Sequence, residues 1–270
     1  MTLFRLVQSA LLFLISISIA LAQDKAEVFV QLGHRSAISS VAVSSNGHKV
    51  ASGSLDGFIK LWDADSGREI KTLEGHQGSV QGLAFSPDGK QLASIGRDRT
   101  LRTWNSITGA TLSAVNAHEN IALAIAFSND GKKIITGSFD KAVKVWDASS
   151  ARTLSALELQ SSPVRSIAIN KEDTLLAVGG EDGVIKLYNF PSGTVAATLQ
   201  GHTNGVLGLA FSPTNKRLVT AGQDGIIKIW DTVSFQEINK ISAHNGATNS
   251  VNFSYDGKWI ASAGQDGLVK

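Results

Sequence analysis

Histidine, serine or threonine, and aspartate recur together in this chain, and these side-chain types can form a nucleophilic catalytic triad. Aspartates stand every 42 residues, at Asp56, Asp98, Asp140, Asp182, Asp224 and Asp266. Four of these copies also hold a histidine, a hydroxyl residue and a tryptophan in fixed register. A hydrolase needs one exposed triad beside an oxyanion hole, so four equivalent copies indicate repeated architecture. The sequence therefore predicts no catalytic residue and a non-enzymatic protein.

The histidines could instead bind a metal ion, because imidazole is a common metal ligand. Five of the six occupy equivalent positions in the copies: His34, His76, His118, His202 and His244. Successive copies form separate structural units, so these side chains are not expected to converge as a metal site requires. The sixth, His48, follows the Asn46-Gly47 turn and is expected on the surface. We expect neither a metal nor a cofactor.

The fixed period means that one supersecondary unit is repeated, and its second copy shows the pattern best. Residues 79–85 and 91–95 are predicted strands, joined by the turn-forming Pro87-Asp88-Gly89. A third predicted strand ends at Trp104, and a fourth covers residues 111–115. Four antiparallel strands in each copy are typical of one propeller blade, so the predicted fold class is an all-β propeller.

Residues 26–270 resemble the WD-repeat β-propeller family. The defining pair stands as Trp62-Asp63, Trp104-Asn105, Trp146-Asp147, Tyr188-Asn189 and Trp230-Asp231. Pairs such as Gly33-His34 and Gly75-His76 precede them. The resemblance implies four-stranded blades from repeats at about 34–75, 76–117, 118–159, 160–201 and 202–243, with an incomplete repeat at 244–270. It also implies an interaction scaffold that binds a protein or peptide partner through its loop faces.

The resemblance further implies a structural hydrogen-bond network in each blade. A buried aspartate needs partners, histidine can donate to it, and a buried indole N–H needs an acceptor. The implied members are His34, Ser52, Asp56, Trp62, His76, Ser94, Asp98, Trp104, His118, Thr136, Asp140, Trp146, His202, Thr220, Asp224 and Trp230. The fourth copy departs, because Gln160, Val178 and Tyr188 replace three members while Asp182 stays. This departure is either repeat drift or a softer blade held by its neighbours.

Residues 1–22 stand outside the repeat and have the pattern of a secretory signal peptide. Arg5 precedes an apolar stretch that ends in the small-x-small site Ala20-Leu21-Ala22. We expect cleavage there, which leaves a domain over 23–270 and makes the protein periplasmic or secreted. A permanent N-terminal membrane anchor is the alternative.

Composition and charge narrow the classes of partner. The chain is 43% hydrophobic and 18% charged, as a folded domain with a buried core requires. It has no cysteine, which excludes disulfides and thiol chemistry. The net charge is +2 and no basic run occurs, so nucleic-acid binding is not expected. Neither is membrane binding once the signal segment is removed.

Partner binding is expected at loop positions that vary between copies. Leu55, Arg97 and Phe139 each precede an in-register aspartate, so they should lie on one rim of neighbouring blades. An apolar, arginine and aromatic set is typical of a binding hot spot, and Arg35 and Arg99 could flank it. By resemblance, this is the usual partner-binding face. The alternative is a set of scattered exposed side chains without a partner.

The opposite face offers a second candidate patch. Phe190, Phe235, Tyr255 and Trp259 are large aromatics in loops that share one side of blades 4 to 6. At least Phe235, Tyr255 and Trp259 stand where other copies have smaller or polar residues. We expect these four side chains to form an exposed apolar patch.

Two questions about the whole molecule stay open at this stage. Residues 26–32 have the pattern of a closing strand for the last blade, which would give a six-bladed ring. The sixth copy stops short of its tryptophan position, so the chain could also be part of a larger propeller. The alternatives for function are a ligand-binding or enzymatic propeller using its central channel, and a docking or sensor part of a larger multidomain protein.

Overall fold

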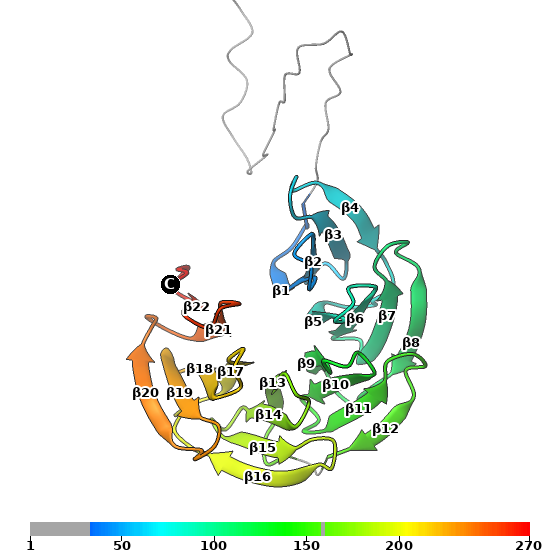
Figure 1. Ribbon diagram of the computed structural model, residues 1–270. Helices are drawn as coiled ribbons and strands as arrows, with labels where there is room; N and C mark the ends of the chain where they lie inside the picture. The colour runs from blue at the N-terminus through cyan, green and yellow to red at the C-terminus, as the bar shows by residue number, and fades with distance from the viewer. Residues whose placement is uncertain (1–32, 158–159) are drawn as a thin grey trace, which may run out of the picture.

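Residues 33–157 and 160–270 are described by a computed structural model, and within them the strands form six antiparallel sheets arranged in an arc (Figure 1). Each sheet lies within one sequence repeat, and we call the sheets blades 1 to 6. The chain is therefore an all-β protein with the architecture of a β-propeller. The strand β5 and its neighbours begin and end within one residue of the predicted positions.

The strands follow one another across each sheet in chain order. Blade 1 contains β1 (Ile38–Val43), β2 (Lys49–Ser54), β3 (Ile59–Asp63) and β4 (Glu69–Leu73). Blade 2 contains β5 (Val80–Phe85), β6 (Gln91–Gly96), β7 (Thr100–Asn105) and β8 (Thr111–Asn116). Blade 3 contains β9 (Ala122–Phe127), β10 (Lys133–Ser138), β11 (Val143–Asp147) and β12 (Thr153–Ala156).

The second half of the arc repeats this order until the last blade. Blade 4 contains β13 (Val164–Ile169), β14 (Leu175–Gly180), β15 (Ile185–Asn189) and β16 (Thr194–Leu199). Blade 5 contains β17 (Val206–Phe211), β18 (Arg217–Gly222), β19 (Ile226–Asp231) and β20 (Glu237–Ser242). Blade 6 contains β21 (Thr248–Phe253) and β22 (Ile260–Gly264), with an isolated bridge from Ala263 to Val269.

The hydrophobic cores lie between neighbouring blades rather than inside single sheets. In the first of them, Ile59 and Leu61 of β3 pack against Val80, Leu92 and Trp104 of blade 2. The blades approach closely here, since a Cβ added to Gly53 of β2 would lie 2.6 Å from Cγ1 of Val80. Equivalent clusters lie between each later pair of neighbouring blades in the described part of the chain. A blade is therefore held mainly by the apolar faces that its two neighbours cover.

The arc is open between β1 and the β21–β22 pair (Figure 1). Val41 and Val43 of β1 are 58% and 59% exposed, although the equivalent Leu83 and Phe127 are 7% and 8% exposed. The difference arises because no described blade lies against the outer face of β1. The predicted closing strand at 26–32 lies outside the described residues.

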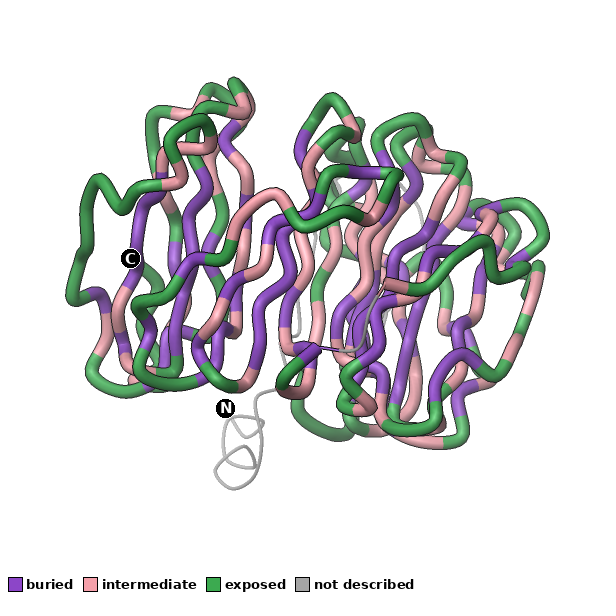
Figure 2. The backbone as a smooth tube through the Cα atoms, turned by 90° about the horizontal axis from the view of Figure 1, so that it is seen from below, coloured by how far each residue is buried: buried purple, intermediate pink, exposed green. Residues whose placement is uncertain are grey.

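The strands run between two loop-bearing faces, and exposed residues gather on both (Figure 2). One face carries the turns between the second and third strands of each blade, together with the loops that contain the in-register histidines. We call this the histidine face. The hairpins between the first and second strands, and the loops between the third and fourth, lie on the opposite face. No described segment is a helix long and apolar enough to cross a membrane.

Candidate functional site

The predicted polar residues meet as hydrogen-bonded chains inside the blades. In blade 2, Trp104 Nε1 donates to Ser94 Oγ at 2.8 Å, and His76 Nε2 lies 2.8 Å from the same oxygen. His76 Nδ1 lies 2.9 Å from a carboxylate oxygen of Asp98. The same connections join the predicted members in blades 1, 3 and 5.

The aspartate of each hydrogen-bonded chain also connects two backbone segments. The carboxylate of Asp98 accepts the N–H groups of Gln77 at 3.0 Å and Thr100 at 3.2 Å. Burial opposes ionisation of Asp98, but the hydrogen bonds from His76 and from these amides outweigh it and hold its pKa far below the ordinary range. Asp98 therefore ties the histidine loop to the turn between β6 and β7.

The histidine side chains of these hydrogen-bonded chains are buried. Burial lowers the pKa of His118 and of His202, although the neighbouring carboxylates of Asp140 and Asp224 partly oppose the shift. A neutral His118 can donate from Nδ1 to Asp140 while its Nε2 accepts the hydroxyl proton of Thr136. Thr136 Oγ1 in turn accepts from Trp146 Nε1. His118 and Thr136 then each donate one hydrogen bond and accept one.

The burial of these groups excludes the nucleophilic use of the hydroxyls. Ser94, Thr136 and Thr220 are 0% exposed, so a substrate carbonyl cannot reach them. A tryptophan N–H already occupies an acceptor position on each hydroxyl oxygen. Among residues 33–157 and 160–270, no group of three or more His, Asp or Glu side chains could hold a metal ion. The hydrogen-bonded chains therefore fix the blades.

Blade 6 contains an incomplete version of this hydrogen-bonded chain, whose members were not predicted. His244 Nε2 lies 2.9 Å from Ser262 Oγ, and His244 Nδ1 lies 2.9 Å from Asp266. The signal was available in the sequence, because these residues continue the 42-residue register.

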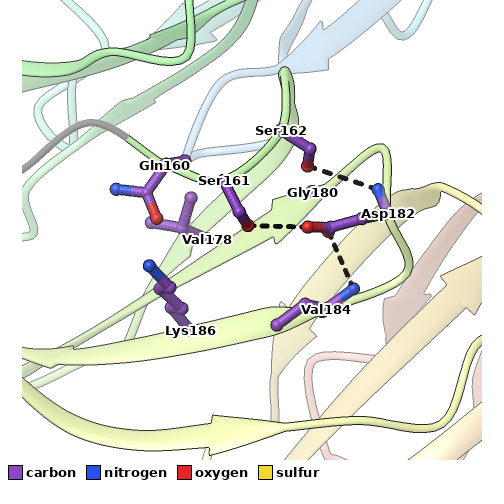
Figure 3. Close-up of a pocket in the computed structure, with 8 residues that line it drawn as sticks. All are labelled: Gln160, Ser161, Ser162, Val178, Gly180, Asp182, Val184 and Lys186. Atoms are coloured by element: carbon purple, nitrogen blue, oxygen red, sulfur yellow. Dashed lines mark hydrogen bonds between the residues drawn. The ribbon is translucent and has the colours of Figure 1, made fainter.

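In blade 4 two separate contacts replace the continuous hydrogen-bonded chain. Tyr188 donates from its hydroxyl to Gln160 Oε1 at 2.9 Å. Ser161 Oγ donates to Asp182 at 2.7 Å (Figure 3). A cavity of about 10 Å³ lies among these groups and is also lined by Val178. That volume holds at most about one water molecule, so the cavity is no substrate site.

The structure places the five predicted rim residues on the exposed part of the histidine face. Leu55 is 49% exposed and Phe139 is 43% exposed, and Arg35, Arg97 and Arg99 are exposed as well. Leu55, Arg97 and Phe139 occupy the same turn position in blades 1, 2 and 3.

A sixth rim residue, Lys141, was missed by the sequence reasoning. It is exposed, with a φ of 72°, two residues after Phe139. Its sequence signal is a lysine where other copies have Gly57, Gly183 and Gly225. We call Arg35, Leu55, Arg97, Arg99, Phe139 and Lys141 the rim of blades 1–3.

The second predicted patch is divided, and the expectation of four exposed aromatics was wrong. Phe190 is 8% exposed and packs into the core between blades 3 and 4, while Phe235 is half-buried against the core between blades 4 and 5. Tyr255 and Trp259 are 98% and 74% exposed. Burying the two phenylalanines between blades removes their apolar area from water, which explains their inward orientation.

Repeated four-stranded blades and buried Trp–Ser/Thr–His–Asp chains define a repeat β-propeller. The polar groups that recur in its repeats have a structural role. The chain belongs to the WD40 repeat family. The family model described as "WD domain, G-beta repeat" matches residues 26–63, 67–105, 109–147, 151–189, 193–231 and 235–270. Proteins of this family usually serve as non-enzymatic protein-interaction scaffolds.

Proposed function

We propose that this chain is a non-enzymatic scaffold that binds a protein or peptide partner through the rim of blades 1–3. The observation that carries the proposal is the placement of Leu55, Arg97 and Phe139. These exposed side chains occupy one turn position on three neighbouring blades, on the face opposite the exposed Ile107. Apolar, aromatic and arginine side chains are the types that contribute most to protein interfaces.

The central channel offers a weaker basis for function. Strands β1, β5, β9, β13, β17 and β21 lie innermost in the arc (Figure 1). In these six strands, Arg165 is the sole ionisable residue, and its Nε lies 3.1 Å from Glu181 Oε2. Acid–base catalysis needs titratable groups that converge on a substrate, and these strands do not supply them.

The proposal extends to export of the protein, which rests on the sequence alone. Arg5, the apolar stretch after it and Ala20-Leu21-Ala22 support removal of residues 1–22 during secretion. Those residues lie outside the described ones. Mass spectrometry of the protein recovered from the extracellular or periplasmic fraction tests export: a mature N-terminus at Gln23 supports it, and an intact Met1 in the cytoplasmic fraction contradicts it.

Site-specific photocrosslinking tests the scaffold function. A photoreactive phenylalanine analogue replaces Leu55 or Phe139 on the rim, and in a control it replaces Ile107, which is 66% exposed on the opposite face. The proposal predicts that one discrete protein adduct forms from both rim positions and not from Ile107. Equal labelling from all three positions, or purified protein that turns over a substrate without any adduct, would contradict it.

A further inference from the structure

We infer that the rim of blades 1–3 recognises an acidic segment of a partner protein. This inference rests on the proposed scaffold function and names the chemistry of the partner. It follows from two cationic residues with positive φ, from the contact of Arg99 with the next blade, and from the uneven distribution of charge around the histidine face.

Two neighbouring turns hold cations in a backbone conformation that favours glycine. Arg99 has a φ of 65° and Lys141 a φ of 72°. Glycine occupies the same turn position in blades 1, 4 and 5, where Gly57, Gly183 and Gly225 have φ values of 85°, 79° and 79°. A long side chain with a Cβ is unfavourable in this region. Where such residues persist, the strained position is a candidate for function.

The other non-glycine residues with positive φ have local reasons for it. Ala151 is 4% exposed, and Phe235 packs against the core between blades 4 and 5. Asp173 and Asn215 are of types that tolerate this conformation, and both side chains accept backbone N–H groups of neighbouring hairpins. The carbonyl oxygens of Arg99 and Lys141 accept backbone N–H groups of the next histidine loop, which supports the turn conformation but does not require a cationic residue there.

The side chain of Arg99 reaches from blade 2 to the histidine loop of blade 3. Arg99 Nη1 lies 3.4 Å from the carbonyl oxygen of Glu119 in the histidine loop of blade 3. The N–H of Glu119 donates to Asp140, which lies between Phe139 and Lys141 in the chain. Arg99 and the turn that carries Phe139 and Lys141 are therefore both connected to the histidine loop of blade 3 through Glu119.

Charge is distributed unevenly around the histidine face. The turns and histidine loops of blades 1–3 expose four cations, Arg35, Arg97, Arg99 and Lys141, against the two exposed carboxylates of Glu74 and Glu119. The equivalent loops and turns of blades 4–6 contain no lysine or arginine, but Glu181 and Asp182 lie there. The aspartates of blades 1–3 are less exposed than the cations and accept hydrogen bonds from histidine and backbone.

The positive charge of the rim indicates which kind of partner segment it would bind. A surface with cations on both sides of apolar Leu55 and Phe139 suits a segment in which acidic and apolar residues mix. Nucleic acid fits less well, because the cations form no continuous run along which a phosphate backbone could bind.

The test uses a short fluorescent peptide rich in glutamate and leucine, with a lysine-for-glutamate peptide as its counterpart. Arg99→Gly and Lys141→Gly together remove two charges and restore the glycine of the other copies. The matched control, Lys90→Gln with Lys132→Gln, removes two exposed charges from the opposite face. Fluorescence anisotropy should show that the acidic peptide binds and that the glycine variant weakens binding about tenfold or more, while the control variant does not.

The glycine variant should melt at the same temperature as the unchanged protein or above it, because the strain is relieved. Raising ionic strength from about 0.05 to about 0.5 M should weaken binding of the acidic peptide. Three results would overturn the inference: equal effects of both variants, preference for the lysine peptide, or stronger binding of a single-stranded oligonucleotide. A rim adduct in the crosslinking experiment that survives these results would leave the scaffold function standing with a partner of different chemistry.

Discussion

The hydroxyl of Ser94 connects two buried groups that have different needs. The indole N–H of Trp104 requires an acceptor, and Nε2 of His76 requires a donor if the imidazole is neutral. One small residue supplies both roles at a position that is 0% exposed. The same arrangement explains why Val178 in blade 4 occurs together with Gln160 and Tyr188, which bond to each other instead.

Replacing Ser94 by alanine should therefore destabilise the protein more than its size suggests. Two buried polar atoms lose their partner, and each unsatisfied group costs about 1–3 kcal/mol. We expect a loss of about 2–4 kcal/mol in the free energy of unfolding, measured by urea denaturation. Ser155→Ala on the exposed edge strand β12 is the control and should change stability by less than about 0.5 kcal/mol. Similar effects of the two substitutions would contradict a structural role for the hydrogen-bonded chain.

The buried histidines also predict how stability depends on pH. The pKa of His118 and of His202 lies below the ordinary histidine value of 6.5, so below that pH the unfolded chain binds more protons than the folded protein. Stability should therefore fall as the pH decreases below about 6.5. The aspartates have folded pKa values below 3.8, so acid below that value removes a further contribution.

Urea midpoints between neutral and acidic pH measure this dependence. His118→Gln introduces the residue type that blade 4 has at the same position, and it should reduce the slope between pH 7 and pH 5. His48→Gln is the control, since the imidazole of His48 is exposed and pairs with exposed Asp65. An unchanged slope in the His118 variant would contradict the prediction, because it would show that folding does not shift the pKa of this imidazole.

At the scale of the blade, identical residues have different surroundings at the two ends of the arc. Val41 of β1 and Val251 of β21 occupy the same repeat position, but Val41 is 58% exposed and Val251 is 5% exposed. Val251 packs into the core between blades 5 and 6. The contribution of each valine to the free energy of unfolding therefore depends on whether a preceding blade covers its side chain, and not on the strand that carries it.

Alanine substitutions at these two positions test that dependence. Val251→Ala should lower the free energy of unfolding by about 2 kcal/mol, because it leaves a cavity between two blades. Val41→Ala should change it by less than about 0.5 kcal/mol, as expected for an exposed site. Chemical denaturation of both variants provides the measurement. A loss at Val41 as large as that at Val251 would show that the outer face of β1 is covered in solution.

The period of the sequence was sufficient to predict the strands, because each copy repeats the same alternation of apolar runs and turn residues. It also allowed the polar chains to be placed, since their members keep the register. It could not tell which way an aromatic loop residue points. Phe190 and Tyr255 both occur in loops of the same face, yet one packs between blades and the other is exposed. Lys141 went unnoticed because a lysine in an exposed turn is unusual only when it is compared with the glycine that other copies have there.

At the scale of the whole molecule, the position of the apolar cores between blades means that each blade is stabilised mainly by its neighbours. The apolar clusters of the described residues each join two adjacent blades, as in other repeat proteins whose stability is a sum of nearest-neighbour terms. Inner blades are covered on two faces. Blades 1 and 6 border the opening of the arc and are covered on one (Figure 1). Local opening should therefore cost less at the two ends than in the middle.

Native-state hydrogen exchange measures this gradient directly. Backbone amides of β2, which pairs with β1, should exchange faster than those of β10 in blade 3, although both strands are second in their blade and make equivalent ladders. The comparison controls for local hydrogen bonding, because the two strands have the same register with their neighbours. Equal protection of β2 and β10 would contradict an open arc, because it requires an apolar surface against β1 that buries Val41 and Val43 in solution.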